Sequence, residues 1–224
     1  MAKYAIDLSP LKKSKDFSLL WAAGLISYFG SMITYVAVPF QIKELTGSYV
    51  AVAISGLVEI VPLIVFGLYG GVLADALDRK KLIWVTELLS LLFTAILLIN
   101  SMMDSPNLLL IYIVSGLFAA TSGLRQPAMQ AALPRLVDHE DMTAAAALMS
   151  LRWQVGVIVG PAVGGILISS YSVAVGYAAD IATFIVSIAL IAFMKNIPPS
   201  HEAEAPSLSA LIDGVKYAFS RKDL

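Results

Sequence analysis

Cysteine is absent from the 224-residue sequence, and histidine occurs only at His139 and His201. The lack of cysteine excludes disulfides, thiolate metal ligands and thiol nucleophiles within this chain. Both histidines fall in segments predicted to be loops, so a buried histidine metal centre cannot form. We therefore expect no metal site and no enzymatic activity, because the apolar segments contain no His, Cys or metal-ligand cluster for the chemistry.

Charged residues are also scarce. They make up 14% of the sequence, whereas soluble domains carry about 25%. Hydrophobic residues make up 58%, and the mean hydropathy is +0.82. The net charge of −1 gives no reason to expect a nucleic-acid partner. The composition is that of a protein whose partner is the lipid bilayer.

The apolar residues form blocks of about 20 or more, which is long enough to cross a hydrocarbon core of about 30 Å as helices. Short breaks with charged, proline and turn residues separate the blocks, and such backbone is tolerated only outside the lipid. The sequence thus predicts an all-α membrane protein with six transmembrane helices in residues 17–194, flanked by segments 1–16 and 195–224. The blocks are Phe17–Phe40, Tyr49–Ala74, Leu82–Met102, Leu108–Leu133, Thr143–Ser170 and Val173–Met194.

Lysine and arginine are distributed unequally between the two sets of loops. One set contains only Lys43. Because loops rich in Lys and Arg stay in the cytoplasm, we expect a multi-pass protein of the cell membrane with both termini cytoplasmic. The basic residues of the other set are Lys3, Lys12, Lys13, Lys15, Arg79, Lys80, Lys81, Arg135 and Lys195.

The last segment, 195–224, begins as a polar linker with proline and acidic residues. Apolar residues then recur at helical spacing, which predicts an amphipathic helix on the cytoplasmic face. Such a linker typically leads to a further domain, so we expect a second half of the same polypeptide, or a second copy of the chain, as partner. The apolar positions are Leu208, Leu211, Ile212, Val215 and Phe219.

Two stretches carry specific patterns. Residues 71–80 contain Gly71, Leu73, Asp75, Arg79 and Lys80 at the spacing Gly-x-Leu-x-Asp-x-x-x-Arg-Lys. This pattern resembles the signature that major facilitator superfamily transporters carry between their second and third helices.

The second pattern lies in the fifth predicted helix. "GVIVGPAVGG" places Gly156, Gly160, Pro161, Gly164 and Gly165 at the spacing Gly-x-x-x-Gly-Pro-x-x-Gly-Gly. It resembles the fifth-helix signature of the antiporters of the same superfamily. The stretches "LPRLV" and "YAADIATFIVS" also resemble its branch of drug and siderophore exporters.

The resemblance implies the N-terminal six-helix bundle of a major facilitator fold, built from two inverted three-helix repeats. Pro62 and Pro161, in the second and fifth helices, are consistent with such a repeat. The implied function is secondary active export of a small organic molecule, either a drug-like compound or a siderophore, in exchange for protons by alternating access. No cofactor is expected, because the proton gradient supplies the energy. A six-helix membrane scaffold or partner subunit that transports nothing is the alternative.

Each pattern has a simpler interpretation beside the functional one. Asp75, beside Arg79 and Lys80, either closes a cytoplasmic gate by charge pairing or receives the positive N-terminus of another helix. The simpler interpretation is a solvated turn that obeys the positive-inside rule. The glycines four residues apart either pack helices closely or, as the resemblance implies, belong to a hinge bent at Pro161 that restricts proton leak.

Five ionisable residues fall inside the predicted spans. Each would cost about 2.5–3.5 kcal/mol at the centre of the lipid, so we expect them to face the interior and to pair. Their positions along the helices place three of them near the midplane, where transporters bind substrate and coupling ions. These three are Glu59, Arg125 and Arg152, and the other two are Glu87 and Asp180.

The acid–base chemistry of these five side chains determines which role each is predicted to have. Arginine keeps its proton, so Arg125 and Arg152 hold anions or tune neighbouring carboxylates. The proton carrier must be an acid, and we predict Glu59 first and Asp180 second, with a structural hydrogen-bonding role as the alternative for Asp180. Glu87 is predicted to partner basic groups.

Arg125 precedes Gln126 and Gln130 in the fourth helix, which resembles the cavity-lining helix of the family. Substrate contact and an internal salt bridge both remain open for Arg125.

Overall fold

The computed structural model describes residues 7–199. The predicted amphipathic helix of residues 208–219 lies outside the described residues. All regular structure in residues 7–199 is helical, and six of the helices are long and apolar enough to cross a membrane. The predicted all-α membrane fold is therefore confirmed.

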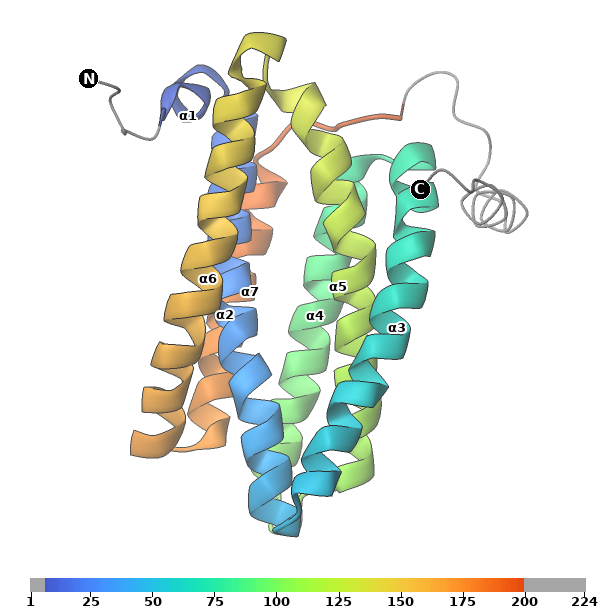
Figure 1. Ribbon diagram of the computed structural model, residues 1–224, viewed down its shortest axis with the longest axis vertical. Coiled ribbons are helices and arrows are strands. Elements are labelled where there is room, and N and C mark those ends of the chain that lie inside the picture. The colour runs from blue at the N-terminus through green and yellow to red at the C-terminus, as the bar shows by residue number, and fades with distance from the viewer. Residues whose placement is uncertain (1–6, 200–224) are drawn as a thin grey trace, which may run out of the picture.

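The six long helices run alongside one another as a bundle, with the short α1 at one end (Figure 1). We refer to this end of the bundle as the α1 end. The elements are α1 Ser9–Lys13, α2 Lys15–Thr46, α3 Tyr49–Ala76, α4 Arg79–Ser101, α5 Leu108–Leu136, the 3₁₀ turn η1 His139–Asp141, α6 Met142–Ser170 and α7 Val173–Ala192.

Polar side chains fix where most of the long helices begin. Each accepts a hydrogen bond from the backbone N–H three residues later, which satisfies one of the free donors of the first turn. These N-cap residues are Ser14 of α2, Ser48 of α3, Asp78 of α4, Asn107 of α5 and Ser172 of α7.

The first span is longer than predicted at its C-terminal end. The apolar block ends at Phe40, but α2 continues through the polar residues to Thr46. It stops at Gly47, whose φ of 65° is the left-handed conformation that glycine adopts without steric cost. Polarity thus marks where the chain leaves the lipid, while the glycine marks where the helix ends.

The packing of the helices has an internal two-fold symmetry. α2 packs chiefly against α6 and α7, whereas α5 packs chiefly against α3 and α4, and α4 contacts α7. Exchanging α2–α3–α4 with α5–α6–α7 reproduces this pattern. Because three spans is an odd number, the two groups enter the membrane from opposite sides. The bundle therefore consists of two inverted three-helix repeats, as predicted.

Glycine allows α3 and α5 to approach at backbone distance. A Cβ built on Gly123 of α5 would lie 2.7 Å from the carbonyl oxygen of Leu63 and 2.9 Å from the backbone nitrogen of Gly67 in α3. A Cβ on Gly70 would lie 2.9 Å from the Cα of Leu124. All three neighbouring atoms belong to the backbone and cannot rotate away, so Gly70 and Gly123 require glycine.

Gly123→Ala should therefore destabilise the protein by about 1–3 kcal/mol, because the added methyl group forces two backbones apart. The measurement is the apparent Tm of the purified protein in detergent. Gly67→Ala is the matched control in the same interface, since a Cβ there meets nothing within 4 Å. Equal Tm values for the two variants would contradict the close approach.

Candidate functional site

A buried ion pair joins two helices in the middle of the bundle. Nη1 of Arg125 in α5 lies 2.7 Å from Oε1 of Glu87 in α4. The hydroxyl of Ser27 in α2 donates to the same oxygen over 2.9 Å. Glu87 is only 1% exposed. The basic partner predicted for Glu87 is thus Arg125, and not the basic residues at the start of α4.

A second arginine lies in the same part of the bundle without a carboxylate partner. Arg152 of α6 is 8% exposed, and neither salt bridge within residues 7–199 includes it. Its Nη1 contacts the thioether sulfur of Met129 at 3.8 Å, and its Nε has no hydrogen-bond partner. The guanidinium lies against Gly24 of α2, where a Cβ would overlap it.

Three glutamines on the two helices that carry these arginines are exposed on the bundle surface. Gln126 and Gln130 lie on α5, and Gln154 lies on α6 two residues after Arg152. Exposed amides within membrane-spanning helices would be costly against lipid, since nothing there can hydrogen-bond them. This surface is therefore suited to face water or a polar ligand.

Asp180 is hydrogen-bonded to hydroxyl groups and to neither arginine. Its carboxylate accepts hydrogen bonds from Thr34 of α2 at 2.5 Å, from Thr94 of α4 at 3.4 Å and from Thr183 of α7 at 3.3 Å. Asp180 has no exposed surface. The three hydroxyl groups compensate the burial of this carboxyl without a cation.

Glu59 of α3 does not join either cluster. It is half-buried and forms no hydrogen bond or ion pair with any residue in the range 7–199. The expectation that all five intramembrane charges pair is therefore wrong for Glu59 and Arg152 within the described bundle. Sequence spacing placed both near mid-span but could not show that they lack partners.

The residues of the predicted gate make different contacts from those expected. Arg79 donates to the carbonyl of Pro198 over 2.6 Å, and Lys80 donates to the carbonyls of Ala192 and Met194 over 3.1 and 2.5 Å. Asp75 is exposed in the last turn of α3. Within residues 7–199, Asp75 forms no ion pair with either cation. Lys80 instead meets carbonyls at the C-terminal end of α7, and Arg79 meets a carbonyl in the segment that follows it.

The glycine motif of α6 faces α2. A Cβ on Gly156 would overlap the ring of Tyr28, one on Gly160 would lie 3.0 Å from the carbonyl of Phe29, and one on Gly164 would lie 3.1 Å from the Cα of Ile33. This is close helix packing of the kind that small residues four apart permit. Around Gly165 the space is open, and α6 continues past Pro161 to Ser170.

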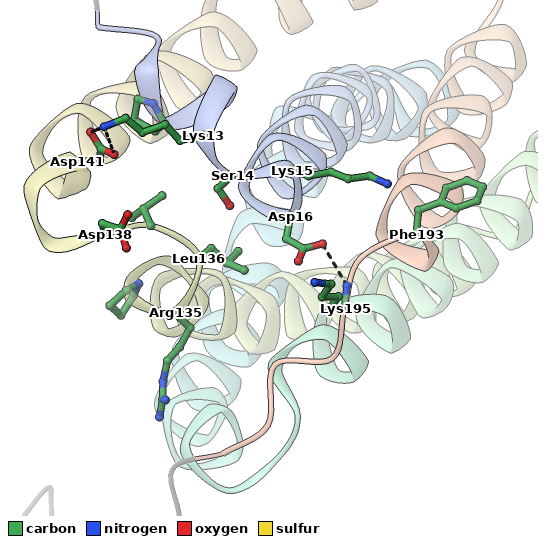
Figure 2. A pocket seen from close by; sticks show the side chains of 13 residues that line it. Lys13, Ser14, Lys15, Asp16, Arg135, Leu136, Asp138, Asp141, Phe193 and Lys195 are labelled. Carbon is green, nitrogen blue, oxygen red and sulfur yellow. Dashed lines mark hydrogen bonds and ion pairs between the residues drawn. The ribbon is translucent and has the colours of Figure 1, made fainter.

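At the α1 end, a surface pocket of about 550 Å³ lies between α1, the α5–α6 connection and the end of α7. Figure 2 shows Lys13 pointing to Asp141, and Asp16 facing the backbone of Lys195. None of the mid-span charges lines this pocket, so we assign it to the mouth of the bundle and not to the buried site.

The contact of Lys13 with Asp141 ties α1 to the start of α6. Nζ of Lys13 lies 2.9 Å from Oδ2 of Asp141. The hydrogen bond and the charge of Asp141 raise the pKa of Lys13 above its ordinary value of 10.5. The stabilisation from this raised pKa is present below pH 10.5 and is lost as the pH rises through the raised value.

Several residues of the site were not predicted. Ser27 and Gly24 carry no signal, because a serine or glycine in an apolar helix is usually a packing residue. Gln154 could have been found, since it is a polar residue next to Arg152 in an otherwise apolar run.

The Glu87–Arg125 pair can be tested by a double-mutant cycle of Glu87→Gln and Arg125→Gln. Each single change leaves a buried charge uncompensated and should cost about 3–5 kcal/mol of unfolding free energy. The double variant should lose less than the sum, as measured by unfolding in detergent. Asp104→Asn, in an exposed loop, is the control. Strictly additive losses would show that the two side chains are not coupled.

Comparison with known proteins identifies the family to which the chain belongs. A family model described as "Transmembrane secretion effector" matches residues 5–224. The Enterobactin exporter EntS of Shigella boydii serotype 18 is 33% identical over 218 residues, which cover 96% of this chain and 51% of that protein. The protein of the same name from Escherichia coli (strain SE11) is 32% identical over the same shares. The chain spans about half the length of the curated relatives it matches.

Solved structures show the same fold. The crystal structure of the peptide transporter POT in a mutant form with alafosfalin superposes with a TM-score of 0.66 at 15% identity, over 92% of this chain and 46% of that one. The structure of POT with sulfate gives 0.62 at 14% identity, over 92% and 45%. The bundle thus has the fold of one half of a transporter. With a family model covering nearly its whole length, this chain belongs to the transmembrane secretion effector family of major facilitator transporters.

Proposed function

We propose that the complete protein is a secondary active exporter that moves a small organic molecule out of the cell in exchange for protons. The observation that carries this proposal is the incompletely neutralised charge cluster in the middle of a membrane-spanning bundle. Such a cluster is costly in lipid and is typical of substrate and ion pathways. The enterobactin exporters among its relatives support a siderophore-like cargo.

Alternating access requires a second bundle, and the surface of this one has room for it. α3 and α6 are the least buried of the six spans, and they are equivalent under the internal symmetry. Apolar side chains such as Ile64 and Ile158 are 57% and 70% exposed on them. We assign these faces to contacts with the second half of the polypeptide or with a second copy of the chain.

The α1 end is assigned to the cytoplasm. The described basic residues outside the spans lie there, with the exception of Lys43 at the opposite end. This agrees with the positive-inside rule. Asp75, exposed at this end, is placed to meet the second bundle when the cytoplasmic side closes, while Arg79 and Lys80 hold the chain that leaves α7.

Glu59 is the proposed proton carrier, and Asp180 the structural acid. A carrier must exchange its proton with water on each side in turn. Glu59 is half-buried and has no partner among residues 7–199, so it is free to do so. Asp180 is fully enclosed by three hydroxyl groups and links α2, α4 and α7.

Glu59→Gln in the complete protein should abolish proton-driven efflux, because glutamine keeps the shape of the side chain but cannot carry a proton. The measurement is enterobactin transport into everted vesicles with an imposed pH gradient. Glu44→Gln, at the exposed end of α2, is the matched control.

Unchanged coupling in Glu59→Gln would remove this residue as the carrier. Absence of proton-dependent flux in the complete protein, together with no phenotype from the Glu59, Glu87 and Arg125 variants, would favour the non-transporting scaffold.

A further inference from the structure

We propose that Arg152 binds an acidic group of the exported molecule, so that the cargo of this transporter carries a carboxylate or a similar oxyanion. The inference rests on the proposed function and names the class of molecule that the buried site accepts.

The charges of the buried cluster do not balance. Arg125 and Arg152 contribute two positive charges, and Glu87 contributes one negative charge. Glu87 is committed through Oε1 to Arg125 at 2.7 Å and to Ser27 at 2.9 Å. These three groups therefore have a surplus of one positive charge. The other buried carboxylate, Asp180, is hydrogen-bonded to threonines and pairs with neither arginine.

Rearrangement of Glu87 cannot remove this surplus. Its second oxygen, Oε2, is buried without a partner, so the carboxylate could turn to meet Arg152. One carboxylate still leaves one guanidinium uncompensated, whichever arginine it joins. The described bundle thus offers no direct carboxylate partner for the second guanidinium, and an anionic ligand would supply one.

The surroundings of Arg152 fit a ligand better than a structural contact. A thioether is a weak acceptor, and Met129 at 3.8 Å is the sole partner found for this guanidinium in the described bundle. Nε is buried and unsatisfied. Guanidinium presents parallel N–H groups that bind a carboxylate through two hydrogen bonds, and Arg152 lacks such a partner.

The lack of a side chain at Gly24 sets the position of the Arg152 guanidinium. Gly24 has no side chain at the point where the guanidinium lies against α2. Arg152 would then hold the acidic group where it lies against α2.

The test measures equilibrium binding of two fluorescent probes, dansylglycine and dansylglycinamide, to the purified complete protein in nanodiscs without a gradient. The probes differ only in a carboxylate and its neutral amide. We expect the carboxylate to bind about 10- to 100-fold more tightly, as a charge-assisted hydrogen-bonded pair allows. Arg152→Gln should remove this preference, and Arg152→Lys should retain part of it, because lysine keeps the charge but loses the fork.

A second variant perturbs the geometry and keeps the charge. Gly24→Ala puts a methyl group where the guanidinium lies, and it should weaken carboxylate binding at least several-fold while leaving the amide unaffected. Gly56→Ala is the matched control, since a Cβ there meets nothing within 4 Å. Gly24→Ala keeps the test informative if Arg152→Gln fails to fold.

The inference is overturned if the wild type binds both probes equally or binds neither, or if Arg152→Gln keeps the preference. These outcomes are separate from those of the transport assay. A protein that exports a neutral or cationic cargo without needing Arg152 would refute the anionic class and leave export standing. A protein that prefers the carboxylate but moves nothing in vesicles would support the anionic class and refute export.

Discussion

The bundle depends on the high cost of an uncompensated charge in a medium of low dielectric constant. Glu87 and Arg125 meet this constraint for each other, and in doing so they fix α4 against α5, with Ser27 bringing in α2. Asp180 meets it with hydroxyl groups from α2, α4 and α7. Of these polar contacts, those between α4 and α5, between α2 and α7 and between α4 and α7 join helices that also pack closely, so there the two forces favour one arrangement.

Small residues let the two repeats pack in equivalent ways. The contact of α6 with α2 and the contact of α3 with α5 exchange under the internal symmetry, and glycine forms both of them. Gly156, Gly160 and Gly164 serve the first contact, while Gly70 and Gly123 serve the second. Only the first set matches a family pattern, but the geometry gives both sets the same role. Close backbone packing is therefore a property of the repeat and not of one motif.

The sequence predicted the helices well because a span has a length and a composition that can be counted. It also predicted that Glu87, Arg125, Arg152 and Asp180 lie inside the bundle. It could not predict their partners, since Glu87 and Arg125 are 38 residues apart and nothing in an apolar run marks which helix faces which. The contacts of Arg79 and Lys80 were missed for a related reason: their acceptors are backbone carbonyls, which every residue has.

The two charges left without partners show where the described bundle is electrostatically incomplete. Glu59 lies on α3 and Arg152 lies on α6, and these two helices are symmetry-equivalent and are the least buried spans. The one mid-span charge on the central helices α2 and α5 is Arg125, and it is paired with Glu87. A bundle built only for stability would pair its charges throughout, because each unpaired charge opposes folding. One acid and one base that stay unpaired on the outermost helices are instead suited to groups that come and go, a proton in the first case and an anionic cargo in the second.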